Sequence, residues 1–193
     1  FYSSRSDVET VLSDNFFGSY TITNHLIENG HKRIGFVGNI TATSSIQDRF
    51  LGYYKSLLEH GLPLRDDWII NDRDEDGLSY KTIRLPDEMP TAFVCNCDRI
   101  AYQLINQLKV MGYHVPEDIS IVGYDNHIYS TISNPRITTM DVNSYRMTTE
   151  AVEIMVKKIR DNSYHCGRIL VTGKLLERDS VKNLNVEDEK FFK

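Results

Sequence analysis

The sequence predicts an α/β fold in which helices pack on both faces of a parallel β-sheet. Apolar, strand-like segments alternate with amphipathic, helix-like segments along most of the 193 residues, and this alternation is typical of repeated βαβ units. The segment Ile119–Val122 is predominantly apolar, as expected of a strand that is buried on both faces. Gly30, Gly61 and Gly112 each follow a helical pattern, and glycine is a common residue at the end of a helix.

The order of the elements follows from these patterns. The segment 46–60 carries Phe50, Tyr53 and Leu57 at the three- and four-residue spacing of a buried helix face. Asn143 is a favourable N-cap for the helix that follows it. No amphipathic helix is recognisable in the loop 71–89, and loops this long are usually functional or mobile. In full, strands are predicted at 8–12, 33–38, 68–70, 90–95, 119–122, 137–142, 169–171 and 175–176, and helices at 15–29, 46–60, 98–111 and 144–161.

The composition is that of an ordinary globular chain. Hydrophobic residues make up 40% and charged residues 25%, and the formal net charge is −5. Because DNA affinity depends on neutralising phosphates with Lys and Arg, this charge argues against a dominant nucleic-acid surface. No apolar run approaches the ~20 residues that span a bilayer, and no signal peptide is recognisable after Phe1. We expect a cytoplasmic protein without membrane contact, and the missing initiator Met indicates a fragment or a processed product.

The three cysteines do not predict a disulfide framework, because their number is odd. Cys95 and Cys97 are separated by one residue, and no second pair with metal-site spacing accompanies them. We expect small, buried thiols here, with a metal or redox site as the alternative. The six histidines are scattered without metal-ligand spacing. The sequence therefore predicts no metal site and no cofactor.

One carboxylate stands at the end of a predicted buried strand. The strand that begins at Ile119 stops at Gly123, and Asp125 follows after one further residue. Ligands of open parallel sheets bind in the crevice at the carboxyl ends of the strands. A carboxylate there accepts hydrogen bonds from hydroxyl or N–H groups, which suits a sugar or a purine. Asp125 is therefore a candidate ligand residue, and a turn-forming role is the alternative.

Eight short blocks occur in a fixed order along the chain. They are Asp14–Gly18, His25–Ile34, Arg49–Tyr53, Pro90–Ala92, Gly112–Asp118, Gly123–Asn126, Ile137–Thr139 and Leu176–Ser180. Each block alone has little specificity. Taken together in this order, over residues 8–182, they resemble the LacI/GalR family of bacterial transcription regulators.

The resemblance implies a periplasmic-binding-protein-like fold of type I, in which a three-strand hinge joins two α/β lobes and an effector binds in the cleft. It implies a nearly complete C-terminal lobe at 15–141 plus 168–182. The N-terminal lobe is then partial, with a remnant at 1–14 plus 142–167, and residues 183–193 form a tail. The DNA-binding headpiece of the family is not expected within this sequence. The hinge segments are expected near 14–18, 141–143 and 167–169.

The resemblance also implies further effector contacts. Arg49 matches the family's ligand arginine, whose planar donors suit hydroxyl pairs or a carboxylate, and a surface ion pair is the alternative. Ser45 lies where relatives place a polar contact, and a helix N-cap is the alternative. Asp72 and Asp74 occupy a loop in which relatives often carry an aromatic residue, and a solvated acidic loop is the alternative. Cys97, at another strand end, completes the candidate set.

The function implied is that of a ligand-sensing domain. It would bind a small polar effector, a sugar or else a nucleobase, and would control DNA binding by a helix-turn-helix allosterically. Relatives imply a homodimer that contacts DNA only through the headpiece. A periplasmic-type sugar-binding protein for transport is the alternative. We do not expect an enzyme, because the sequence lacks a G-x-G-x-x-G motif after a strand, a phosphate loop and a G-x-S-x-G motif.

Overall fold

The computed structural model describes residues 8–74 and 80–188. The strands are β1 Thr10–Ser13, β2 Ile34–Val37, β3 Ile69–Ile70, β4 Ala92–Cys95, β5 Ser120–Tyr124, β6 Thr138–Asp141, β7 Arg168–Val171 and β8 Lys174–Leu176. The helices are α1 Asn15–Glu28, α2 Ser44–Glu59, α3 Asp98–Val110, α4 Tyr129–Ile132, α5 Ser144–Arg160 and α6 Asn185–Asp188, with a 3₁₀ turn at Asp66–Trp68.

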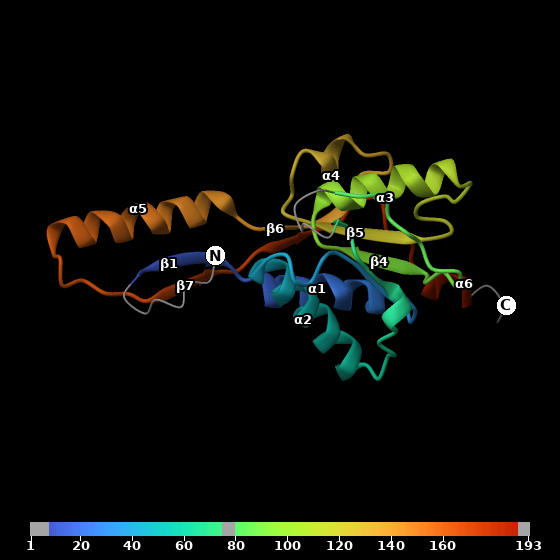
Figure 1. Cartoon of the computed structure of the whole chain (residues 1–193), viewed down its shortest axis with the longest axis horizontal. Coiled ribbons are helices and arrows are strands. Elements are labelled where there is room, and N and C mark those ends of the chain that lie inside the picture. Colours follow the sequence, from blue (N-terminus) through green and yellow to red (C-terminus); the bar gives the residue numbers. More distant parts are fainter. Residues whose placement is uncertain (1–7, 75–79, 189–193) are drawn as a thin grey trace.

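The strands form two sheets (Figure 1). The larger sheet has six strands in the order β3-β2-β4-β5-β6-β8, and the smaller pairs β1 with β7. The first five strands of the larger sheet are parallel to their neighbours. β8 pairs with β6 in the antiparallel direction. The predicted parallel sheet is confirmed, with one antiparallel edge strand that the pattern of the sequence did not indicate.

The larger sheet separates two hydrophobic cores. On one face, α1 buries Ile22 and Leu26 and α2 buries Tyr53, all with 0% exposure. On the other face, α3 buries Leu104 and Leu108 completely. Helices therefore cover both faces, as the alternation of strands and helices predicted.

The packing of α1 on α2 depends on a glycine. A Cβ atom at Gly52 would lie 2.1 Å from the carbonyl oxygen of Phe16 and 2.9 Å from the backbone nitrogen of Tyr20. Both neighbours are backbone atoms of α1, so neither can move without moving the helix. The absence of a side chain at this position allows the two helices to approach.

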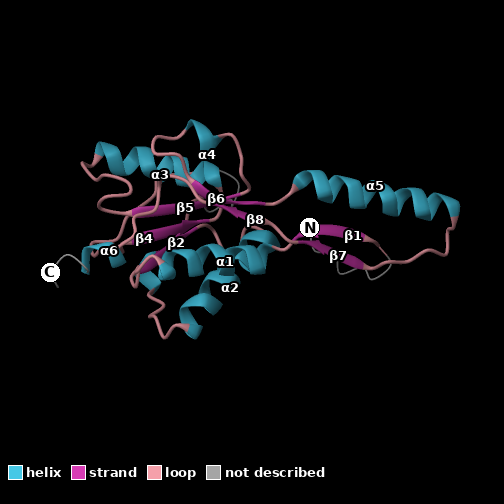
Figure 2. Ribbon diagram, turned by 180° about the vertical axis from the view of Figure 1, so that it is seen from behind, coloured by secondary structure: helices cyan, strands magenta, loops and turns pink. Residues whose placement is uncertain are grey.

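A smaller unit lies beside the larger sheet and consists of β1, β7 and α5 (Figure 2). The β1 and β7 strands pair in parallel from Thr10 opposite Arg168 to Ser13 opposite Val171. Three connections join this unit to the larger sheet, at residue 14, at 142–143 and at 172–173. We expected the third connection near 167–169 and assigned residues from 168 onward to the C-terminal lobe. The pairing of β7 with β1 moves that connection to a point after Val171.

Local capping groups determine where the helices begin. The side chains of Asp14, Thr43 and Asn143 each accept a hydrogen bond from a backbone N–H group in the following turn. The predicted cap at Asn143 is therefore confirmed. Because Thr43 caps α2, this helix begins at Ser44, two residues before the predicted start, and Ser45 lies within its first turn. Within the described residues, no helix has both the length and the apolar character needed to cross a bilayer.

Candidate functional site

The carboxyl ends of β2, β4 and β5 lie next to one another, because these strands are parallel neighbours. The chain leaves β4 through Asn96 and Cys97, and it leaves β5 through Asp125 and Asn126. Ligands of open α/β sheets bind at this edge. Arg49 of α2 reaches the same edge, where it contacts both of these strand ends.

Arg49 is held by partners on several sides and is only 9% exposed. Its Nε atom donates to Asn15 Oδ1 at 2.8 Å, and Nη1 donates to the carbonyl oxygen of Asn96 at 2.5 Å. Nη2 donates to Asp125 Oδ1 at 2.9 Å. The guanidinium carbon lies 3.9 Å from the centroid of the Tyr124 ring, a favourable cation–π distance. These contacts hold the guanidinium beside the Asp125 carboxylate.

Asp125 has an uncommon backbone conformation. Its φ angle is 97°, and that of Asn126 is 53°. Non-glycine residues rarely adopt positive φ, and such strain costs roughly 1–3 kcal/mol and concentrates at ligand sites. The Asp125 side chain is 37% exposed. Its carboxylate therefore combines a firm protein contact, to Arg49, with access for an outside donor.

Asp125 lines a pocket of about 300 Å³, which is at the lower end of the range for small-molecule sites. The other lining residues are Cys97, Asp98, Arg99, His127 and Tyr129. The rings of His127 and Tyr129 stack with centroids 5.3 Å apart. The pocket thus presents a charged group and a ring surface beside one another, a combination suited to a ligand with both hydroxyl groups and a flat face.

Asp98 supports this pocket and is completely buried. Its Oδ1 accepts from Thr139 Oγ1 at 2.6 Å, and its Oδ2 accepts from the backbone nitrogen of His127 at 2.6 Å. Burial raises the pKa of Asp98 to about 7, against the opposing effect of these two hydrogen bonds. A Cβ at Gly123 would lie 2.2 Å from Oδ1, so the glycine makes room for the carboxyl. Asp98 therefore connects α3, β6 and the turn after β5.

Asp72 is also completely buried, and both of its oxygens are bonded within the protein. Oδ1 accepts from the backbone nitrogen of Asn39 at 2.6 Å, and Oδ2 accepts from Asn96 Nδ2 at 2.8 Å. These bonds join the loop after β2 to the end of β4. Because Asp72 is completely buried and each oxygen bonds to a different loop, this residue holds the neighbouring loops in position.

The remaining candidates are placed differently from one another. Ser45 is half-buried in the first turn of α2. Cys97 lines the pocket, and burial raises the pKa of its thiol to about 11, so that the thiol stays protonated at neutral pH. Asp74 is exposed and is the last residue described before the gap at 75–79. The structure brings Arg49, Asp125 and Cys97 together, and it does not join Asp74 to them.

The sequence interpretation missed the residues that orient this site. Asn15 holds Arg49 with its side-chain oxygen, and Asn96 holds it with its backbone carbonyl oxygen. The buried side-chain amide of Asn96 donates to Asp72, and an amide directly after a predicted strand was a usable signal for this residue. Arg178 donates to Asn126 Oδ1 at 2.8 Å and so supports the turn after β5. Tyr129 lies in the short helix α4, whose four residues carry no readable periodicity.

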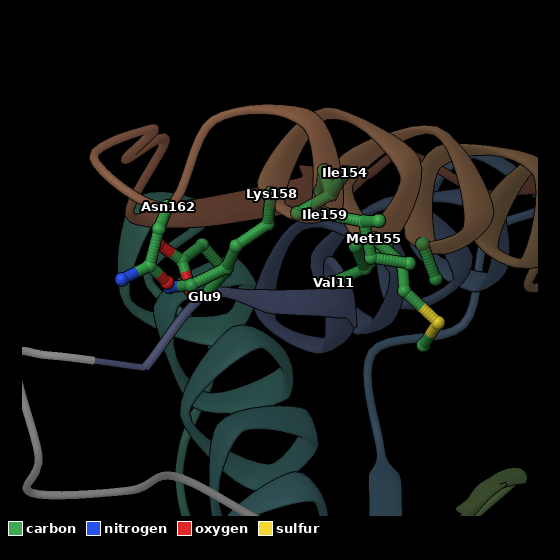
Figure 3. Close-up of a pocket in the computed structure, with 8 residues that line it drawn as sticks. Glu9, Val11, Ile154, Met155, Lys158, Ile159 and Asn162 are labelled. Atoms are coloured by element: carbon green, nitrogen blue, oxygen red, sulfur yellow. The ribbon is translucent and has the colours of Figure 1, made fainter.

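A larger cavity of about 590 Å³ lies between α5 and β1 (Figure 3). Most of its lining is apolar and includes Val11, Met155 and Ile159. At one end Lys158 forms an ion pair with Glu9, and this contact lowers the pKa of Glu9 to about 2. The cavity belongs to the smaller unit and contains none of the predicted ligand residues.

The chain is similar in sequence to known proteins. The family model for a periplasmic binding protein-like domain matches residues 23–181. The HTH-type transcriptional repressor PurR of Actinobacillus pleuropneumoniae is 34% identical over 183 residues, which cover 92% of this chain and 54% of the relative. The chain therefore spans about half the length of the curated relatives it matches.

Solved structures share the fold. A LacI-type transcription regulator from Bifidobacterium animalis has a TM-score of 0.74 at 25% identity, over 93% of this chain and 69% of that chain. A LacI family transcriptional regulator from Enterococcus faecium with bound ribose has a TM-score of 0.78 at 21% identity, over 94% and 68%.

These matches confirm the predicted periplasmic-binding-protein-like fold. They also confirm the expectation of a regulatory domain rather than an enzyme. The chain belongs to the periplasmic binding protein-like domain family and, within it, to the LacI family of transcription regulators.

Proposed function

We propose that this chain senses a small polar effector for a bacterial transcription regulator and binds it at the carboxyl ends of β2, β4 and β5. The observation that carries the proposal is the ion pair between Arg49 and Asp125, with its 2.9 Å contact, at the edge of a pocket. The strained backbone of Asp125 supports it, because strain of this kind is retained where function needs it.

The chemistry of the pair favours a hydroxyl-rich effector. The exposed carboxylate of Asp125 accepts a hydrogen bond from a hydroxyl group. The Nε, the Nη1 and one of the two Nη2 N–H groups of Arg49 are bonded within the protein, and the remaining Nη2 N–H donates to the oxygen of the same or a neighbouring hydroxyl. A sugar offers such adjacent hydroxyls. A nucleobase offers N–H and carbonyl groups to the same pair and remains the second candidate effector.

The mechanism that we propose is a population shift between two arrangements of the lobes. The connections at residue 14, 142–143 and 172–173 would act as the hinge between the larger sheet and the smaller unit. An effector that contacts both sides of the cleft binds one arrangement more tightly and so increases its population. In the whole regulator, that arrangement would set the affinity of a helix-turn-helix for DNA in the cytoplasm. The repressor relatives favour this role over transport.

Isothermal titration against a panel of sugars and nucleobases tests the proposal. We expect at least one ligand with a micromolar to millimolar Kd, and at least a hundredfold weaker binding in Asp125→Ala. Asp118→Ala is the matched control, because Asp118 is an exposed carboxylate near the opposite, amino end of β5. Asp125→Asn, checked for folding by circular dichroism, repeats the test with a smaller change. Unaltered affinity in both Asp125 variants would remove this residue from the site.

A homodimer is the second part of the proposal. Ile128 lies just before α4 and Ile132 is its last residue. Their exposed fractions are 58% and 57%. Apolar side chains gathered on one surface often mark a protein–protein contact. We expect sedimentation velocity to show a dimer that Ile128→Asp combined with Ile132→Asp dissociates. Leu58→Asp, at a 59% exposed position on α2, serves as the control, and a monomeric parent chain would contradict the proposal.

A further inference from the structure

We propose that the effector carries an anionic group, a phosphate or a carboxylate on a small sugar, and that Arg99 binds it. This inference rests on the proposed function, because it names the class of ligand for the same pocket. The charged groups at the strand ends are not all paired in the same way.

Arg99 lies in the first turn of α3, is exposed, and lines the 300 Å³ pocket together with Asp125. Its guanidinium carbon is 4.3 Å from the centroid of the Tyr80 ring. A guanidinium stacked on a ring keeps the donors at its edge available, because the stacking uses only its face. Within the described part of the chain, no carboxylate lies at ion-pair distance from Arg99.

The other arginines at this edge have partners. Arg49 is paired with Asp125 at 2.9 Å, and Arg73 lies 3.7 Å from Asp72. Arg178 donates to the side chain of Asn126. Arg99 is the arginine in the lining of the pocket, and no carboxylate among the described residues compensates its charge.

The carboxylates near Arg99 do not block an anion. Both oxygens of Asp98 accept hydrogen bonds from protein donors, and burial keeps this residue partly protonated near neutral pH. The negative charge of Asp125 is compensated by Arg49. An anion at Arg99 and a hydroxyl at Asp125 are therefore compatible within one ligand, and Arg–phosphate or Arg–carboxylate contacts are among the stronger hydrogen bonds in proteins.

Arg73 contacts the same aromatic ring as Arg99. The guanidinium carbon of Arg73 is 4.9 Å from the same Tyr80 ring that Arg99 contacts. The Tyr80 ring therefore contacts two guanidinium groups, and one of them, Arg99, lines the pocket. In the sequence, Arg73 lies in the loop where relatives often carry an aromatic residue, and this chain has an arginine there between Asp72 and Asp74.

Inorganic phosphate is the minimal probe for this inference, and NMR titration of the chain is the measurement. We expect phosphate to shift the backbone resonances of Arg99 and His127, with an affinity at least tenfold weaker in Arg99→Met. Arg136→Met is the matched control, because Arg136 is an exposed arginine bound to Asp179 outside this pocket. Calorimetry then compares glucose with glucose 6-phosphate and glucuronate, and ribose with ribose 5-phosphate.

The inference is supported if an anionic sugar binds at least tenfold more tightly than its neutral parent and Arg99→Met abolishes this difference. Comparison of the sugar phosphates with glucuronate then distinguishes a phosphate from a carboxylate. Phosphate binding that Arg99→Met leaves unchanged overturns it, and so does the absence of Arg99-dependent binding for phosphate and for every anionic sugar tested. If neutral sugars still bind in an Asp125-dependent way, the proposed function survives that failure. If no neutral or anionic ligand depends on Asp125, both proposals fall.

Discussion

Replacing Arg49 by Met should destabilise the fold more than replacing Asp125 by Asn, although the two residues form one ion pair. The reason is their unequal burial. Arg49 is 9% exposed, whereas the Asp125 side chain is 37% exposed. Water can therefore replace part of what the carboxylate loses, but it reaches the partners of Arg49 poorly.

The contacts give the magnitude. Arg49→Met leaves Asn15 Oδ1 and the Asn96 carbonyl oxygen without their donor, in addition to breaking the ion pair. Each buried acceptor that is left without its donor costs about 1–3 kcal/mol, so these two acceptors should together cost about 2–6 kcal/mol, whereas the carboxylate of Asp125 that remains is partly hydrated. Asp125→Asn removes the counterion of Arg49 but keeps an acceptor oxygen for Nη2. The guanidinium also keeps the oxygens of Asn15 and Asn96 and the ring of Tyr124, so the loss should be about 1–2 kcal/mol. The difference should thus exceed ~1 kcal/mol.

Urea unfolding followed by tryptophan fluorescence measures both values. The chain contains one Trp, and Trp68 is 1% exposed, so its emission reports loss of the core. Arg136→Met, which removes an exposed arginine from its ion pair with Asp179, should leave the midpoint unchanged. Equal losses in Arg49→Met and Asp125→Asn, or a larger loss in the latter, would refute the argument from burial.

Gly52→Ala should lower the free energy of unfolding by roughly 1–3 kcal/mol, because the new Cβ would lie 2.1 Å from a backbone oxygen of α1. Gln47→Ala, on the exposed side of α2, should leave the free energy of unfolding unchanged. Asp125→Gly should be about 1 kcal/mol more stable than Asp125→Ala, because glycine tolerates the φ angle of 97°; equal urea midpoints would count against strain there. Burial raises the pKa of Asp98 from 3.8 to about 7, so the unfolded chain loses this proton at a lower pH than the folded chain does. The free energy of unfolding should therefore fall as the pH rises from about 4 to about 7, by at most ~4 kcal/mol. Asp98→Asn should remove that component, and parallel pH profiles for the two proteins would show that Asp98 does not titrate in this range.

Much of the fold could be predicted because its signals are local. The helix periodicity around Tyr53 and the cap at Asn143 each depend on a few adjacent residues, and the structure confirms both. The predicted start of α2 was two residues late because Thr43, Ser44 and Ser45 are all able to cap a helix. Only the backbone geometry shows that Thr43 does so.

The assignment of β7 failed for a different reason. An apolar segment such as 168–171 can pair with either sheet, and strand pairing joins residues far apart in the chain. Its partner, β1, begins at Thr10, and no feature of the two segments indicates that they pair. The division between the lobes, and with it the place of the third connection, therefore depended on long-range pairing.

For the candidate site, too, local features could be predicted from the sequence and long-range contacts could not. The sequence alone predicts that Asp125 follows a buried strand, and hence that it stands at the edge of the sheet where ligands bind, because strand direction and strand end are local properties. It does not predict that Arg49, 76 positions away, bonds to Asp125, or that Asp72 turns inward to Asn39 and Asn96. Nor does it predict that Arg99 lacks a carboxylate partner among the described residues. Each of these depends on which distant side chains the packing brings within 3–4 Å, and no spacing along the chain encodes that.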